Sequence, residues 1–545
     1  MYSDKSMKKY SVSLLFALLL TFFINGSFAQ QHDDSKKTDL KFSTTLSVIK
    51  NSYVDTVNLP KLVDKAIIEM LKELDPHSVY FTKEKIEKAN EPLVGNFDGI
   101  GVQFQIYKDT ILIVDAIKGG PSEKLGLTAG DKIIRIDQEE ATGKKVTNNY
   151  VIGKLRGPKG TKVTVSIKRK GKKDLMDYTI TRDKIPINSI DASFMVSNQI
   201  GYIKLDRFSR STMEEFTESL AKLKRMGMAS LILDLRGNSG GYLDVAISLS
   251  DEFLETDKLI VYTEGINSPM QKFYSTYRGG FEKGKLVVLI DEGSASASEI
   301  VSGAVQDWDR AVIVGRRSFG KGLVQRPFDL PDGSVIRLTT ARYHTPTGRC
   351  IQKPYEESVD SYYEDFSRRM KKGEFVHPDS IKFPDSLKYY TPAKRIVYGG
   401  GGIMPDVFFP LDTTTVTDYY MDLRRKRVIN DFIIQYVDLK RDSIKTEYSD
   451  FNHFNARFQI DSVFFHDFTS FAIKQGVVKS AKDSGTTKDQ KSDKFLKCQL
   501  KALLASNLYG QDKYYNVIID IDDELRKAIE ILSDDKLFKK LKIKY

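Results

Sequence analysis

Cysteine, histidine and tryptophan are scarce in this sequence, which has two cysteines, six histidines and one tryptophan among 545 residues. Cys350 and Cys498 lie far apart, so we expect two separate thiols and no scaffold that depends on disulfides. None of the histidines stands in a recognisable triad context, and there is no His-Glu-x-x-His motif or similar ligand cluster. The sequence thus argues against histidine-triad and metal-dependent chemistry, and we expect no cofactor and no metal site.

Long apolar runs are also missing. The stretch Ser11–Ile24 has 14 mostly apolar residues, short of the ~20 that a membrane-spanning helix needs. Lysines precede it and small residues follow it at the −3 and −1 positions of a cleavage site: Lys5, Lys8, Lys9, Ser27 and Ala29. This pattern predicts a signal peptide over residues 1–29 and a mature protein that is soluble, exported and periplasmic. No cysteine follows the run, which argues against a lipid anchor.

Charge of one sign does not dominate. The chain has 84 basic and 73 acidic residues, a formal net charge of +11 that is spread along its length. A modest surplus of this kind raises solubility but does not indicate nucleic-acid recognition. The one dense basic run, Lys168–Lys173, is centred on a glycine between two strand-like stretches, and we interpret it as a solvated hairpin turn.

Four regions follow the predicted signal peptide. Residues 39–95 carry apolar residues at three- and four-residue spacing (Leu59, Leu62, Val63, Ala66, Ile67 and Met70), which predicts amphipathic helices. Residues 96–186 change to short alternating strands and glycine turns. In residues 187–410 strands alternate with helices, which predicts a mostly parallel sheet with buried strands at Leu231–Leu235, Leu286–Ile290 and Ala311–Val314. Residues 411–545 are charged and helix-prone, and the polar stretch Ser480–Lys494 is interpreted as a loop or linker.

The segment Leu286–Asp307 carries the strongest chemical signal. An apolar strand ends in small residues, and a helix begins near Ser296. A serine at such a turn has an exposed hydroxyl beside the free N–H groups of the first helical turn, which can stabilise an oxyanion. Ser296 and Glu299 also have the spacing of a capping box, so the segment alone leaves a purely structural role open.

A nucleophilic serine needs a group that accepts its proton. Lysine can serve when desolvation keeps it neutral, and Lys321 lies between two glycines just before a strand-like stretch. By strand alternation, Gln325 would face the same way and could orient the amine. A glycine-flanked lysine is more often a surface turn, so the context has to decide.

The third element is Leu231–Tyr242, where an apolar strand runs into Arg-Gly-Asn-Ser-Gly-Gly. Such a turn presents consecutive backbone N–H groups as an anion nest. The phosphate-loop pattern is absent, an ordinary tight turn is the simplest alternative, and an oxyanion donor from Gly240 or Gly241 fits best.

Taken together, these stretches resemble the carboxy-terminal processing, or tail-specific, serine peptidases. The resemblance covers roughly residues 40–410, and its matching stretches are LDPHS (74–78), LDLRGNSGG (233–241), GSASASE (293–299), GRRSFGKGLVQ (315–325), TTARYHTPTGR (339–349) and YGGGGIMPD (398–406). It implies an α/β fold with a crotonase/ClpP-like catalytic core, an inserted PDZ domain, an N-terminal helical region and a helical C-terminal extension. In some relatives that extension wraps the core.

The resemblance also implies roles for single residues. Ser296 matches the nucleophile, Lys321 the general base and Gln325 the residue that supports the lysine. The N–H of Ala297, with that of Gly240 or Gly241, matches the oxyanion hole. Asp307 matches an acid implicated in some relatives, and we interpret it as structural; we interpret His344 as packed rather than catalytic.

In the segment that resembles a PDZ domain, the carboxylate-binding loop would be Gly99, Ile100, Gly101 and Val102. A substrate tail would add there as a strand. Arg156 resembles an arginine that couples substrate binding to activity. The implied partners are proteins or peptides with apolar C-termini, not nucleic acid. An adaptor protein or a second copy of the chain could also bind, and any membrane association would come through partners.

The sequence therefore predicts an exported serine endopeptidase that recognises substrate C-termini and cleaves with a Ser–Lys pair. The competing hypothesis is a peptide-binding scaffold without catalysis. The joint presence of Ser296, Lys321 and Gln325 argues against the scaffold.

Overall fold

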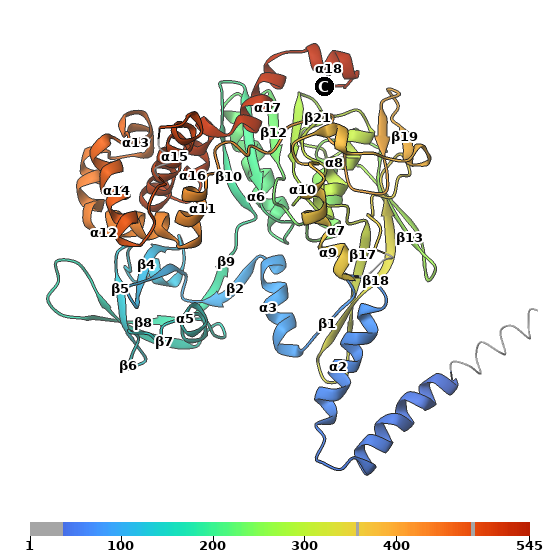
Figure 1. Cartoon of the computed structure of the whole chain (residues 1–545), viewed down its shortest axis with the longest axis horizontal. Coiled ribbons are helices and arrows are strands. Elements are labelled where there is room, and N and C mark those ends of the chain that lie inside the picture. The colour runs from blue at the N-terminus through green and yellow to red at the C-terminus, as the bar shows by residue number, and fades with distance from the viewer. Residues whose placement is uncertain (1–35, 356–358, 481–484) are drawn as a thin grey trace, which may run out of the picture. The chain divides into compact units, whose positions relative to one another are not determined.

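The computed structural model describes residues 36–355, 359–480 and 485–545 (Figure 1). The predicted signal peptide, residues 1–29, lies outside the described residues. The chain divides into two compact units, up to Tyr80 and from Phe81 onward, which are described separately. In the described residues, no helix is both long enough and apolar enough to cross a membrane.

The N-terminal unit is helical, as predicted. Residues 36–52 form one helix and α2 (Leu59–Lys72) a second, which starts where the Asn58 side chain accepts a hydrogen bond from Lys61 N. The predicted apolar stripe is only partly buried: Leu71 is the buried residue of α2, while Met70 is half exposed. Strand β1 (Val79–Phe81) leads into the second unit.

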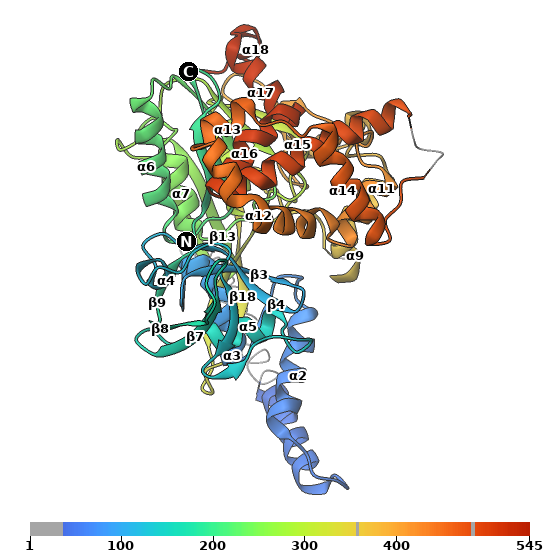
Figure 2. The same cartoon turned by 90° about the vertical axis from the view of Figure 1, so that its left-hand side faces the viewer.

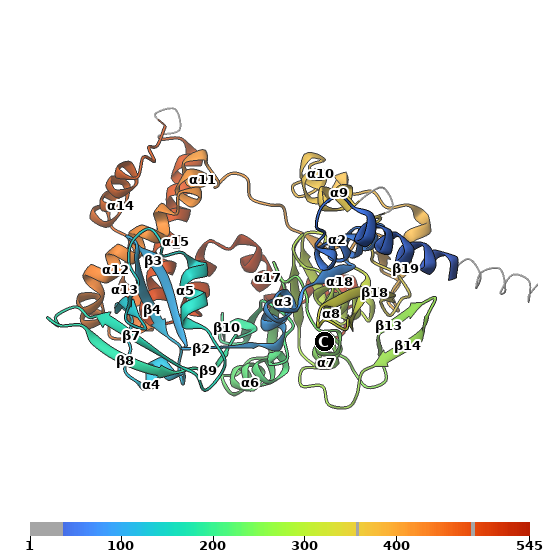
Figure 3. The same ribbon diagram turned by 90° about the horizontal axis from the view of Figure 1, so that it is seen from below.

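Helix α3 (Lys83–Val94) opens the second unit and precedes a strand-rich domain. The domain has a sheet in the order β3-β4-β5-β7-β8, with β6 paired to β5. A separate pair, β2–β9, lies beside it (Figure 3). Two short helices, α4 (Pro121–Lys124) and α5 (Asn148–Leu155), complete it. The basic run Lys168–Lys173 forms the β7–β8 hairpin turn, as predicted. The strands are β2 (Asn96–Gly99), β3 (Val102–Tyr107), β4 (Thr110–Ala116), β5 (Lys132–Ile136), β6 (Glu139–Glu140), β7 (Lys162–Lys168), β8 (Met176–Thr181) and β9 (Asp183–Pro186).

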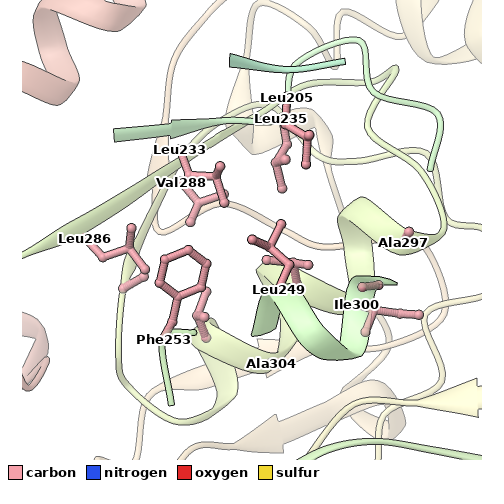
Figure 4. Packing of buried hydrophobic residues seen from close by; sticks show 14 of the residues in the cluster. Leu205, Leu233, Leu235, Leu249, Phe253, Leu286, Val288, Ala297, Ile300 and Ala304 are labelled. Carbon is pink, nitrogen blue, oxygen red and sulfur yellow. The ribbon is translucent and has the colours of Figure 1, made fainter. Parts of the chain in front are cut away.

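The central sheet has the order β10-β11-β12-β15-β16-β21 and is parallel except for β10, as the alternation of strands and helices predicted. Helices α6 (Thr212–Arg225), α7 (Leu243–Asp251) and α8 (Ala297–Asp307) contribute to the apolar cluster on one face. Figure 4 shows Leu233 and Val288 of that face packed with Leu249 and Ile300 of the helices and with Phe253, which follows α7. The strands are β10 (Ile190–Met195), β11 (Ile200–Leu205), β12 (Ser230–Asp234), β15 (Leu286–Ile290), β16 (Val312–Gly315) and β21 (Val407–Phe408).

A second, antiparallel sheet carries part of the site. Strands β17 (Leu323–Asp329), β18 (Val335–His344), β13 (Leu259–Gly265) and β14 (Ser268–Tyr274) pair in that order. After β18 the chain makes an excursion over residues 345–401. Its described part contains α9 (Val359–Tyr363), α10 (Asp365–Lys371), η1 (Pro378–Ser380), η2 (Asp385–Leu387), β19 (Lys388–Tyr390) and β20 (Ile396–Tyr398).

The C-terminal region has two parts. The first is a helical domain with its own core (Figure 2): α11 (Asp418–Arg425), α12 (Val428–Glu447), α13 (Phe451–Arg457), α14 (Ser462–Lys474), α15 (Thr487–Tyr509) and α16 (Lys513–Ile518). The prediction of a loop over Ser480–Lys494 is wrong from Thr487 on, because the Thr486 side chain caps α15 and Asp489 and Ser492 are buried against the domain. The polar composition of the stretch gave no sign that a helix begins inside it.

The second part covers the other face of the central sheet. After η3 (Ile519–Ile521), helices α17 (Asp523–Ser533) and α18 (Lys536–Leu541) place Leu525, Leu532 and Phe538 against Ile232, Val287 and Val312. Residues on these strands alternate between the two faces, so each face needs its own cover. The C-terminal segment therefore completes the core of the central sheet.

Buried charges fix the start of α17 to the sheet. Arg236 contacts Asp234 at 2.6 Å and Asp522 at 2.8 Å. The Glu524 carboxylate lies 3.4 Å from Arg236 and 3.4 Å from Arg316, and its Oε1 has no hydrogen-bond partner among the described residues. Burial raises the pKa of Glu524 to about 7, against the lowering effect of the two arginines.

We predict that Glu524→Gln makes the protein more stable than the wild type at about pH 8 and leaves stability similar at about pH 5. The folded-state pKa of about 7 lies above the ordinary 4.5, so the stability present at low pH falls as pH rises from the lower value to the upper one. The glutamine mimics the protonated acid, and the gain above pH 7 is at most about 3 kcal/mol. Urea unfolding at both pH values measures it. A variant less stable than wild type at the higher pH would show that the arginine contacts outweigh burial.

Candidate active site

Ser296 occupies a strained turn between a buried strand and a buried helix. All residues of β15 are buried, as are all residues of α8, so the turn between them has little freedom to move. Ser296 has φ 55° and ψ −110°, a conformation that L-residues rarely adopt. Such strain persists only where the surroundings enforce it, and it is concentrated at functional sites.

Lys321 lies in the segment between β16 and β17. Phe319 N donates to Ser294 O at 2.9 Å, which fixes the segment against the serine turn. Gly320 has φ 88°, and a Cβ there would lie 3.1 Å from Gly402 N, so glycine is required at this position. Lys321 itself is half buried.

One buried carboxylate joins the two segments. Glu299 accepts hydrogen bonds from Ser296 N at 2.8 Å, Lys321 N at 2.9 Å and Gly320 N at 2.7 Å. Its Oε1 also accepts from the Ser318 hydroxyl. Burial raises the pKa of Glu299, while these four donors lower it. The Glu299 of the sequence-predicted capping box therefore also holds the lysine segment.

A tyrosine makes a second connection. The Tyr343 hydroxyl lies 2.7 Å from Lys321 O and 3.1 Å from Ser296 O, and its side chain is almost fully buried. Tyr343 stands in the stretch TTARYHTPTGR (339–349), and its local sequence does not predict a role at the site. Tyr343 lies on β18, far from Ser296 in sequence, so the sequence alone could not predict this contact.

Ser296, Ala297, Lys321 and Gln325 line one cavity of about 1210 Å³, together with Gly240 and Gly241. The alternation argument for Gln325 does not apply, because β17 begins only at Leu323 and a bulge interrupts it between Val324 and Gln325. The Gln325 amide donates to Thr339 Oγ1 at 3.3 Å. The structure thus brings the residue to the cavity by a different local geometry.

The two candidate glycines differ. Gly240 N donates to Asn238 Oδ1 at 2.8 Å, so its N–H is already used. A Cβ on Gly240 would lie 2.9 Å from Ser296 Cβ, so this glycine permits close contact with the serine turn. In the described part of the chain, neither Gly241 N nor Ala297 N donates a hydrogen bond.

The excursion after β18 forms hydrogen bonds and ion pairs with the segment that carries Lys321. Arg369 donates to Arg317 O at 2.7 Å and to Ser318 O at 3.2 Å, while Glu374 contacts both arginines. Lys353 N donates to Gly320 O, and its ammonium lies 3.8 Å from the centre of the Phe319 ring. Sequence reasoning missed these residues, because nothing in their local pattern indicates which distant segment they contact.

In the strand-rich domain, Gly99 ends β2 and Val102 begins β3, with Ile100 and Gly101 between them. Gly101 has φ 75°, and neither Ile100 N nor Gly101 N donates to a described residue. Arg156 caps α5, stacks 4.0 Å from the centre of the Phe97 ring and forms an ion pair with Glu91 of α3.

Asp307 and His344 do not line the cavity. Asp307 is fully buried and bonds Arg349 at 2.7 Å and the Thr345 and Thr347 hydroxyls. His344 stacks on Tyr262 with ring centres 4.6 Å apart. Cys350 and Cys498 are both free thiols, and the described residues contain no group of side chains that could hold a metal ion.

Comparison with known sequences agrees with this architecture. Residues 199–359 match Peptidase family S41, residues 99–180 a PDZ domain and residues 24–85 the N-terminal domain of the activating protease CtpB. Residues 419–510, most of the helical domain, match a family of unknown function.

Three curated relatives are similar over most of their length. The carboxy-terminal processing protease CtpA of Bacillus subtilis is 35% identical over 357 residues, 64% of this chain and 76% of its own length. CtpB of the same species is 36% identical over 329 residues, 60% and 68% of the two chains. A carboxy-terminal-processing protease of Bartonella bacilliformis is 36% identical over 316 residues, 57% and 72%. The chain therefore belongs to the carboxy-terminal processing serine proteases of peptidase family S41, with a PDZ domain beside its catalytic core.

Proposed function

We propose that this protein is an exported endopeptidase that cleaves with Ser296 and Lys321 after its PDZ domain captures the C-terminus of a substrate. One observation carries the proposal: both residues line the same cavity, and Glu299 and Tyr343 hold their backbones together. Export rests on the N-terminal sequence pattern, and a periplasmic location is part of the proposal. An adaptor protein and self-association remain predictions.

The chemistry follows from these positions. Neutral Lys321 accepts the Ser296 proton while Ser296 Oγ attacks the peptide carbonyl, so a C–O bond forms and the carbonyl oxygen becomes an oxyanion. The lysine then gives the proton to the leaving amine as the C–N bond breaks. Water, deprotonated by the same lysine, hydrolyses the acyl-enzyme and restores Ser296.

The oxyanion hole combines the N–H groups of Ala297 and Gly241. Both donors are unused by described residues, whereas the Gly240 N–H is held by Asn238. Ala297 is the first residue of α8, so the positive end of the helix dipole adds to the stabilisation. Because its N–H is unused, Gly241 is a better second donor than Gly240.

Capture of the substrate tail uses the loop from Gly99 to Val102. Open N–H donors at Ile100 and Gly101 suit a terminal carboxylate, and strand β3 follows at once for main-chain pairing. Arg156 couples this domain to the site through its ion pair with Glu91, because α3 also lines the catalytic cavity with Ile86 and Asn90.

We predict that Ser296→Ala and Lys321→Ala each lower cleavage of an unfolded protein with an apolar tail by about 10³-fold or more. Lys321→Arg should be as inactive, since a guanidinium stays protonated. Lys283→Ala, at an exposed lysine, is the matched control and should cleave normally. Gel and mass-spectrometric assays measure the products, and circular dichroism checks folding. Full activity in either alanine variant would refute the assignment.

We predict that Glu299→Gln lowers kcat more than it raises KM. The glutamine amide group would face N–H and O–H donors where the carboxylate now accepts, so buried donors lose their partners and the two segments separate. A loss of about 100-fold in kcat is expected. Glu299→Asp, which keeps the acceptor chemistry, should retain more activity than the glutamine variant. The reverse order would contradict a positioning role.

We predict that Glu91→Gln and Arg156→Gln weaken cleavage of tail-bearing proteins by similar factors, and that the double variant is no worse than either single one. Loss of a shared ion pair is non-additive in this way. Short peptides without a recognised tail should be cleaved at the wild-type rate. Additive losses would show that the two residues act separately.

A further inference from the structure

The catalytic cavity continues well beyond Ser296. It follows the β17–β18 ribbon away from Tyr343, and Arg337 and Pro327, which are paired across the ribbon, line it. Helix α3 lines it too, with Asn90 among its residues. Arg337 lies six positions before Tyr343 on β18, which corresponds to about 20 Å along an extended strand.

Arg337 carries a half-buried charge without a counter-charge. Its Nη2 donates to Asn90 Oδ1 at 3.1 Å, and its guanidinium lies 5.0 Å from the centre of the Phe81 ring. Among the described residues Arg337 forms no ion pair. By contrast, Arg236, Arg316 and Arg349 of the same core each contact a carboxylate.

Burying the Arg337 guanidinium without a carboxylate partner costs free energy when no ligand is bound. Burial lowers the pKa of Arg337, and no described acid pairs with it to compensate the lost hydration. A guanidinium presents several N–H donors in a planar fork that matches a carboxylate, and Asn90 occupies only one side of it. The remaining donors border a cavity that a peptide must enter.

We propose that Arg337 binds a carboxylate of the substrate, on the part of the chain that follows the scissile bond. This inference rests on the proposed function and specifies a subsite of the same cavity. Asn90, which holds Arg337, is next to Glu91, which pairs with Arg156 of the PDZ domain. The far end of the cavity therefore adjoins the domain that binds the tail.

Spacing sets where the carboxylate lies. An extended peptide that runs from Ser296 along the ribbon places its charge about six residues after the scissile bond. The carboxylate is an Asp or Glu side chain at that position, or the terminus of a short tail. The two sources share one chemistry and differ in whether amidation of the terminus abolishes recognition.

The test compares peptides that share one cleavage site. The first is neutral beyond that site with an amidated end, the second carries Glu at one of positions four to eight, and the third has a free terminus there. For the recognised peptide, Arg337→Gln should lower kcat/KM roughly 10-fold or more through KM, and Arg337→Lys should lose less. Cleavage of the neutral peptide should not change. Arg278→Gln removes an equal charge at an exposed site and should have no effect.

Two results would overturn the proposal: equal losses on the neutral and acidic peptides, or no loss on any peptide. If the wild type cleaves none of the peptides, the proposed function fails instead. In that case, fluorescently labelled forms of the same peptides are bound to Ser296→Ala and to the double variant Ser296→Ala/Arg337→Gln. The difference in binding between these two proteins tests the Arg337 subsite without cleavage. Weaker binding of only the carboxylate-bearing peptide in the double variant supports the subsite, and equal binding rejects it.

Discussion

The buried carboxylate of Glu299 is the interaction on which the site depends. Two segments that are distant in sequence, one ending in Ser296 and one carrying Lys321, donate their backbone N–H groups to the same side chain. Neither segment has a conformation that it would keep alone, since Ser296 has a positive φ and the lysine lies between glycines. A buried acceptor whose lone pairs are all used stabilises one arrangement and penalises the others. The placement of the pair therefore depends on the interior of the core.

The surrounding layers serve that placement. β15 and α8 are buried without exception, which requires cover on both faces of the central sheet. One face has the cluster that includes α7 and α8, and the other has α17 and α18. The C-terminal segment is thus part of the catalytic core in energetic terms, although it lies more than 200 residues after the serine in sequence. Its charged attachment through Arg236 lies in the same strand-turn segment that contributes Gly241 to the cavity.

Sequence reasoning predicted the elements whose signals are local. The buried strand before Ser296, the parallel sheet and the hairpin at Lys168–Lys173 follow from local sequence patterns, and the PDZ domain follows from the resemblance to the family. It failed where tertiary contacts override composition: α15 begins at Thr487 inside a polar stretch, and a bulge in β17 breaks the alternation that was used for Gln325. Tyr343, Lys353 and Arg369 were missed because a residue's sequence neighbours do not reveal which loop it will contact across the fold.

Helix α3 contacts both the catalytic cavity and the PDZ domain. One of its faces lines the cavity through Ile86 and Asn90, and Glu91 reaches the PDZ domain. An ion pair that is about one-third exposed contributes little to the free energy of unfolding. Its role is therefore positional: a shift of the PDZ domain would displace Glu91, the residue next to Asn90. The side-chain oxygen of Asn90 in turn accepts a hydrogen bond from Arg337, a half-buried cavity arginine that forms no ion pair with a described residue. Under the proposed function, capture of the tail and alignment of the chain near Ser296 would be connected through this one helix, and Pro92, a residue at which helices bend, follows directly after the contact.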